Sequence, residues 1–314
     1  MTSSSPRTRP FAREIRVSDG SKREIDQHVE KVLRGLGNPP PPLDLREVRE
    51  LLRLDMGYYS SGDDSALREK LSKLRVAGKQ VLARPGLLVD AVRKHNLRAL
   101  YLPDRKRILL DEDMPKKKHR WSEAHEVGHS LLDWHHETML GDTESTLTPL
   151  CRAHIEAEAN FAAGRLLFLG ARFDDEIVAH PPTIASVQAL AATYGNSITS
   201  TLWRMVEQYP EPVQLVGLVS DHPRYSASNT VVGESPVRHT FFSRTFLRSV
   251  GPVANEILWA HVQSYSSYVK RGPLGQAEVF LASKSGELVP FVFETFYNGY
   301  DALTLGVNSL RKSG

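Results

Sequence analysis

The chain has 314 residues, a formal net charge of +3 and one cysteine. A chain of this length can bury sizeable cores and is expected to form about two or three domains. The near balance of charge gives no strong argument for bulk affinity for nucleic acid. The lone Cys151 excludes an intramolecular disulfide, and no apolar run reaches the roughly 18 residues of a membrane span. Because the amino terminus also lacks a signal-peptide core, we expect a soluble cytoplasmic protein with no membrane partner.

The amino-terminal segment, residues 1–24, is rich in Ser, Arg and Pro and lacks hydrophobic periodicity. We predict a disordered, mildly basic arm here. Residues 25–180 then show helical periodicity interrupted by one pair of strands, which predicts a mainly helical domain with a small sheet. The expected helices before the strands span residues 25–36, 43–54, 66–76 and 87–95.

The strands expected at 99–102 and 107–110 flank a charged turn. They predict a hairpin whose free edge could bind an extended peptide. The basic run 116–120 follows, and we interpret it as a solvated loop, with attraction of an acidic partner as the alternative. The next helix is expected to begin near Ser122, a residue type that caps helices.

This next helix, 121–134, carries His125, Glu126 and His129 in the spacing His-Glu-Xaa-Xaa-His. Residues four apart lie on one helical face, so both imidazoles can hold one metal ion, and Glu126 can act as a general base toward metal-bound water. A buried helix with ordinary core histidines is the alternative for such a pair. Gly128 costs a helix about 1 kcal/mol relative to alanine, which the close approach of another backbone would justify.

The following helical stretch, 154–163, offers a third metal ligand. Glu156 and Asn160 are four apart and can face the same site. Glu156 could bind the metal, and Asn160 could form a hydrogen bond with a ligating imidazole. Glu158 points to a different face, and we interpret it as a solvated charge.

A hydrolytic zinc site usually takes three protein ligands and keeps one open position. We therefore predict that His125, His129 and Glu156 bind one zinc ion per chain, with manganese as the alternative ion, and that Glu126 is the catalytic base.

These residues resemble the ImmA/IrrE family of metallopeptidases. The matching stretches are Arg120-Trp-Ser-Glu-Ala-His-Glu-Val-Gly-His129 and Glu156-Ala-Glu-Ala-Asn-Phe-Ala-Ala163. The resemblance extends over residues 25–210 and implies a bacterial or phage endopeptidase that cleaves a helix-turn-helix transcriptional repressor. A family histidine is expected near the end of the first metal helix, where this chain has Asp133, followed by His135 and His136. Asp133 is therefore our second candidate, beside Asn160, for a hydrogen-bond partner of the ligands.

The next segment, 181–210, begins with two prolines and predicts a helix-turn-helix-like pair, with helices at 184–190 and 198–206. Members of the ImmA/IrrE family carry a similar pair. The second helix has little basic character apart from Arg204. Because a groove reader needs phosphate and base contacts, we favour packing against the peptidase domain, with direct contact to DNA or to a repressor as the alternative.

The carboxyl-terminal segment, 211–314, predicts a compact α+β module. A β-rich run spans 213–219, a long helical pattern spans 249–269, and strands at 277–281 and 288–294 flank a hairpin turn. In some ImmA/IrrE members this module resembles a small-molecule sensor fold, and a structural role or homodimer formation fits equally. The whole chain is thus predicted as α+β, with a mainly helical, zincin-like peptidase core.

We predict a zinc endopeptidase that acts on a helix-turn-helix repressor in stress or mobile-element regulation. One alternative is a non-catalytic DNA-binding regulator with a structural metal site, and another is a toxin–antitoxin or defence component. A structural zinc site would normally be closed by four protein ligands, often cysteines. Three ligands are found here, and Glu126 would have no structural task, so we favour the enzyme.

Overall fold

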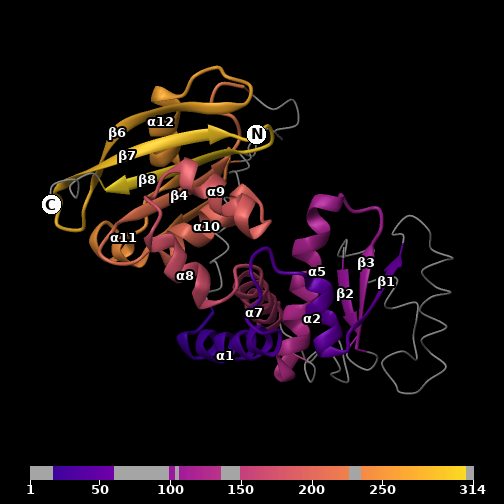
Figure 1. Ribbon diagram of the computed structural model, residues 1–314. Helices are drawn as coiled ribbons and strands as arrows, with labels where there is room; N and C mark the ends of the chain where they lie inside the picture. The colour runs from indigo at the N-terminus through magenta and orange to yellow at the C-terminus, as the bar shows by residue number, and fades with distance from the viewer. Residues whose placement is uncertain (1–16, 60–98, 103–105, 136–148, 226–234, 309–314) are drawn as a thin grey trace, which may run out of the picture. The chain divides into compact units, whose positions relative to one another are not determined.

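The computed structural model describes residues 17–59, 99–102, 106–135, 149–225 and 235–308. Contacts divide the chain into two compact units, Met1–Gly170 and Ala171–Gly314. Each unit combines helices with one sheet, so the predicted α+β class is confirmed (Figure 1). The division at residue 170 comes earlier than the boundary that we predicted at 180. The helices predicted at 66–76 and 87–95 lie outside the described residues.

The first unit contains four described helices and a small sheet. The helices are α1 (Asp19–Gly35), α2 (Leu45–Leu52), α5 (Lys116–Leu131) and α7 (Pro149–Leu167). The strands are β1 (Asp55–Tyr59), β2 (Ala99–Leu102) and β3 (Arg107–Asp111), in the order β1-β3-β2. β2 pairs antiparallel with β3, which confirms the predicted hairpin, and β1 pairs parallel with β3.

Helix α1 begins earlier than the sequence indicated. The hydroxyl oxygen of Ser18 accepts a hydrogen bond from the backbone N–H of Ser21, which is a standard N-cap. Downstream, Ile25 and Val29 are fully buried, and α1 contacts α7. The predicted arm at 1–24 is therefore wrong for residues 19–24, because a cap and a buried stripe stabilise a helix there.

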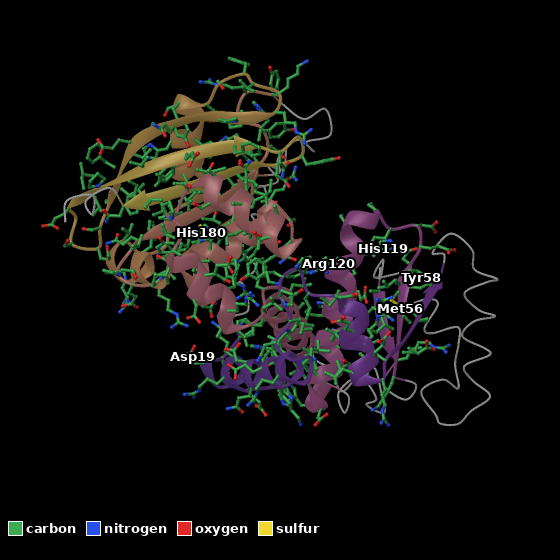
Figure 2. The ribbon with its side chains drawn as sticks, viewed as in Figure 1. Asp19, Met56, Tyr58, His119, Arg120 and His180 are labelled. Carbon is green, nitrogen blue, oxygen red and sulfur yellow. The ribbon has the colours of Figure 1, made fainter. Side chains whose placement is uncertain are left out.

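Helix α5, which carries the His-Glu-Xaa-Xaa-His residues, starts at Lys116 instead of near Ser122. The run 116–120 is therefore the beginning of a helix and not a loop. His119 and Arg120 lie in these first turns (Figure 2). Nη1 of Arg120 donates to the backbone carbonyl of Leu43 at 2.8 Å, and His119 Nε2 lies 2.8 Å from the Met114 carbonyl. At least these two basic side chains anchor the helix start to its neighbours.

The second unit is a five-stranded antiparallel sheet with helices, in the strand order β5-β4-β8-β7-β6. Its strands are β4 (Leu215–Ser220), β5 (Val237–Phe242), β6 (Gly272–Ala282), β7 (Leu288–Tyr297) and β8 (Ala302–Asn308). Its helices are α8 (Ala171–Val178), α9 (Ile184–Tyr194), α10 (Ile198–Gln208), α11 (Arg244–Ser249) and α12 (Asn255–Tyr265). The two strands predicted around the 283–287 turn are β6 and β7, and both are longer than predicted.

Both faces of the sheet are covered at β4, where all six residues are buried. Val216 belongs to the apolar core shared with α11 and α12. Its neighbour Gly217 lies opposite Phe241 on the other face, where Trp203 of α10 stacks on the Phe241 ring. The helix predicted at 249–269 is α12, which is shorter than predicted, since it spans only Asn255–Tyr265.

Helices α9 and α10 form the predicted helix pair and contact each other. Side chains of Thr183 and Ser197 cap their first turns, and Gly195 ends α9 in the left-handed region with φ 64°. The pair packs on the sheet of its own unit, α10 against β4, β5 and β8 and α9 against β7. None of the helices found among the described residues is long and apolar enough to cross a membrane.

Candidate metal centre

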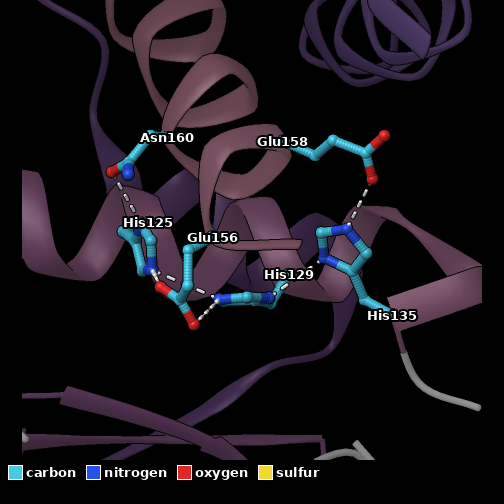
Figure 3. A network of polar contacts seen from close by, with 6 residues as sticks. All are labelled: His125, His129, His135, Glu156, Glu158 and Asn160. Atoms are coloured by element: carbon cyan, nitrogen blue, oxygen red, sulfur yellow. Dashed lines mark hydrogen bonds and ion pairs between the residues drawn. The ribbon is translucent and has the colours of Figure 1, made fainter. Parts of the chain in front are cut away.

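Three side chains converge where α5 packs against α7. His125 and His129 come from α5, Glu156 comes from α7, and one ligand atom of each lies within 4.8 Å of the other two. The two Nε2 atoms are 3.2 Å apart, His125 Nε2 is 3.2 Å from Glu156 Oε2, and His129 Nε2 is 3.9 Å from Glu156 Oε1 (Figure 3). Tetrahedral zinc with bonds of about 2.0–2.1 Å separates its ligand atoms by about 3.3 Å. The predicted ligands therefore fit one metal ion.

The helices that carry the predicted ligands, α5 and α7, approach closely because Gly128 has no side chain. A Cβ at this position would stand 2.8 Å from the Ala159 carbonyl oxygen and 3.3 Å from the Ala162 Cβ. The expected reason for a glycine in this helix, the close approach of another backbone, is confirmed.

The site is closed on the histidine side and open at the glutamate. The side chains of His125 and His129 are 16% and 4% exposed, whereas that of Glu156 is 53% exposed. A structural zinc site is normally closed by a fourth protein ligand. The exposed edge at Glu156 leaves room for a further ligand or a substrate to approach.

Asn160 lies beside the first histidine ligand, as predicted. Its Oδ1 is 3.0 Å from Nδ1 of His125. A carbonyl oxygen only accepts, so Nδ1 carries a proton, and the neutral ring then has its lone pair on Nε2, the atom that faces His129 and Glu156. This tautomer is the one that can bind a metal through Nε2.

The second predicted outer residue, Asp133, is exposed, and its assignment is corrected. The contact of His129 Nδ1 is with Nδ1 of His135 at 3.0 Å. Nε2 of His135 in turn lies 3.1 Å from Oε2 of Glu158, which also accepts a hydrogen bond from Trp134 Nε1 at 2.8 Å. The interpretation of Glu158 as a solvated charge is therefore wrong. The histidine expected near the end of α5 is found two residues later, at 135.

Charges around the ligands favour a cation. Burial lowers the pKa of His125, but the hydrogen bond to Glu156 and the charges of Glu126 and Glu156 outweigh it and raise the pKa overall. Burial raises the pKa of Glu156, yet its contacts with His125 and the charge of His129 hold it below the usual value. The same field that stabilises an imidazolium would stabilise a metal ion, because both carry positive charge.

Of the two outer residues, Glu158 is charged and His135 is neutral. Burial of Glu158 raises its pKa, but hydrogen bonds from Trp134, His135 and Ser21 outweigh this effect and lower it, so the group is a carboxylate at neutral pH. Burial lowers the pKa of His135 despite its contact with Glu158, so its ring is neutral.

Glu126, the predicted base, is 5% exposed on the α5 face that contacts β2. Burial and the nearby Glu156 raise its pKa to about 7, against the opposing effects of His125 and of a hydrogen bond from the backbone N–H of Tyr101. A carboxyl group with this pKa can take up and release a proton near neutral pH, which suits general acid–base chemistry.

Comparisons with known proteins agree with this geometry. Residues 80–205 match the model of the IrrE N-terminal-like domain family, Peptidase_M78. No curated protein matches the chain. A solved structure described as a Mycobacterium tuberculosis transcriptional regulator is similar, with a TM-score of 0.51, 14% identity, and coverage of 93% of this chain and 92% of that chain. At this identity the similarity shows the fold alone. The resemblance to the ImmA/IrrE family is confirmed over residues 80–205, the segment that matches the IrrE N-terminal-like domain of Peptidase_M78.

Proposed function

We propose that this protein is a zinc-dependent endopeptidase whose active site is built from His125, Glu126, His129 and Glu156. The observation that carries the proposal is the convergence of three ligands on one point, beside a buried carboxyl group whose pKa is raised to about 7. A structural metal site needs the ligands but has no use for such a carboxyl group.

Each residue has a distinct task in this reaction. His125, His129 and Glu156 would hold the ion, and an ion held there would acidify a water molecule and polarise the scissile carbonyl. Glu126 accepts the proton of the attacking water and returns it to the leaving amine. Its burial between α5 and β2 keeps bulk water away, and the Tyr101 N–H fixes the position of its carboxylate.

The proposed substrate is a helix-turn-helix transcriptional repressor, in stress or mobile-element regulation. This part of the proposal is supported by the family resemblance and not by a contact in this chain. A protein substrate could pair with strand β2, which lies at the edge of the order β1-β3-β2 among the described strands.

The decisive experiment compares the wild-type protein with Glu126→Gln. Both are loaded with zinc and incubated with candidate repressors, and fragments are identified by mass spectrometry. We expect about one zinc per chain in both proteins and cleavage by the wild type alone, because an amide cannot take up the water's proton. Cleavage that persists in Glu126→Gln would remove this residue as the base.

The second candidate is a non-catalytic DNA-binding regulator. The observation in its favour is the helix pair α9–α10, together with the similar solved structure described as a transcriptional regulator. The single basic residue of α10, Arg204, is buried and thus poorly placed for phosphate contacts. Salt-dependent DNA binding by the wild type, without cleavage of any repressor in the presence of zinc, would favour this candidate.

A further inference from the structure

We propose that His135 and Glu158 act together as positioning residues that hold His129 in its metal-binding orientation. We call the pair the His135–Glu158 relay. The inference rests on the proposed metal site and concerns how this chain builds the support of its second histidine ligand.

Distances place the relay in one continuous line. His129 Nδ1 lies 3.0 Å from His135 Nδ1, and His135 Nε2 lies 3.1 Å from Glu158 Oε2 (Figure 3). At its other end, His129 Nε2 faces His125 Nε2 and Glu156. Both nitrogens of His135 are therefore used, one toward a ligand and one toward a carboxylate.

Proton counting along this line leaves one arrangement. A carboxylate oxygen only accepts, so Nε2 of His135 carries the ring proton and donates to Glu158. In a neutral ring the other nitrogen, Nδ1, is then an acceptor, and His129 Nδ1 must donate to it. The lone pair of His129 consequently lies on Nε2, the atom that faces the other two ligands. The relay thus selects the tautomer that binds metal, as Asn160 does for His125.

Burial and anchoring make this orientation rigid. His135 is fully buried, and the Glu158 side chain is 15% exposed. Glu158 also accepts a hydrogen bond from Trp134 Nε1 at 2.8 Å, and a further one from Ser21 of α1. Because Glu158 is tied to α1, α7 and the segment after α5, it cannot turn away without breaking several contacts at once.

A space-filling role alone does not account for these contacts. A buried histidine needs polar partners, and the Glu158 carboxylate already provides one. The additional contact, at Nδ1, is with His129, a predicted metal ligand. His135 reaches this ligand because the chain turns back after α5. Leu132 leaves the helical conformation, and the His135 N–H bonds to the Leu132 carbonyl at 2.9 Å, which brings the ring under His129.

The test measures zinc affinity of the full chain by competition with a chromogenic chelator, in the wild type, His135→Leu, His135→Asn and Glu158→Gln. Losing a hydrogen-bond partner of a ligand typically costs about 10–100-fold in metal affinity. We expect a loss of this size in His135→Leu and a smaller loss in Glu158→Gln. His135→Asn should keep most of the affinity, because its amide oxygen can accept from His129 Nδ1.

Trp134→Phe is the matched control, since it removes a donor to Glu158 but leaves the relay intact. We expect it to bind zinc nearly as the wild type does. Cobalt-substituted protein adds a second readout: the visible absorption of His135→Leu should change shape, and that of Trp134→Phe should not. Circular dichroism of the metal-free variants checks the fold, and if His135→Leu does not fold, His135→Asn and Glu158→Gln carry the comparison.

Wild-type affinity and an unchanged cobalt spectrum in folded His135→Leu would overturn the relay. An equal loss in Trp134→Phe would also overturn it, because local packing would then be the cause. Failure of the wild type to bind zinc would instead contradict the proposed function, so the two failures are distinguishable.

Discussion

Gly128 of α5 lies directly against the carbonyl oxygen of Ala159 on α7, so that a Cβ at position 128 would stand 2.8 Å from that oxygen. This contact sets how closely the two metal helices approach. The histidines come from one helix and Glu156 from the other, so the spacing of the ligands depends on the same contact.

Gly128→Ala therefore tests whether packing controls the site. Alanine favours a helix by about 1 kcal/mol over glycine, but overpacking against a backbone oxygen typically costs about 1–3 kcal/mol. We expect a net loss of stability and weaker zinc binding, measured by chemical denaturation and chelator competition. Gly20→Ala is the control, because its Cβ would meet only the Ser18 hydroxyl at 3.7 Å. A Gly128→Ala protein that is more stable than the wild type would contradict the tight contact.

Glu156→Ala should lose most of the bound zinc, because two imidazoles would then be the only predicted protein ligands left. Elemental analysis after dialysis measures the zinc content per chain. His154→Ala, an exposed position on the same helix, should retain it. Full retention in Glu156→Ala would show that the third ligand is another residue.

Asn160 provides a test of the support for His125. Asn160→Leu removes the carbonyl oxygen that lies 3.0 Å from His125 Nδ1, so the proton on Nδ1 loses its acceptor. Zinc affinity should then fall about 10-fold or more. Asn160→Asp keeps an acceptor at the same place and should bind zinc at least as tightly as the wild type. Equal losses in the two variants would point to packing as the cause.

Zinc removal should destabilise the unit that contains the site. A ligand present at 100 times its Kd stabilises the folded state by about 2.7 kcal/mol. We expect chelation to lower the melting temperature of the transition assigned to Met1–Gly170, measured by differential scanning calorimetry. The metal-depleted Glu156→Ala protein should show no response to added zinc. A wild-type melting curve that is identical with and without chelator would argue against a site in the folded protein.

Tyr194 provides a stability test in the second unit. Its hydroxyl donates to a Glu176 carboxylate oxygen at 2.6 Å. Burial and the Glu176 carboxylate raise the pKa of Tyr194 well above its usual range, so the hydroxyl remains a donor at neutral pH. Tyr194→Phe should cost about 1–2 kcal/mol, because Glu176 loses this donor. Tyr300→Phe, where the ring is 74% exposed, should change stability little by comparison.

Local periodicity was enough to predict the ligand set. His125 and His129 are four apart, as are Glu156 and Asn160, and each pair occupies one face of a helix. This spacing involves only a few consecutive residues, so it can be read from the sequence without knowledge of the tertiary structure. The hairpin before α5 and the two long strands around the 283–287 turn were also predicted from local patterns.

Contacts between distant segments were not readable in the same way. Helix α5 starts early, where Arg120 binds the carbonyl of Leu43, and α1 starts early at a capping serine in a segment of low periodicity. The helix pair at 184–208 packs on the sheet of its own unit. The sequence did not indicate this partner, because the apolar residues of the pair could have packed against any apolar surface.

The sequence alone determined which side chains share a helical face. His125 and His129 are four residues apart, as are Glu156 and Asn160, so each pair lies on one face of its helix. Only the tertiary structure decided what supports these side chains. His135 lies beyond the end of α5, outside any helical spacing with His129, and a turn at Leu132 brings it back to the ligand. Glu158 lies off the face that carries Glu156, and its partners come from the segment after α5 and from α1. A polar side chain in such a position is either solvated or part of a network, and only the packing of three separate segments distinguishes the two.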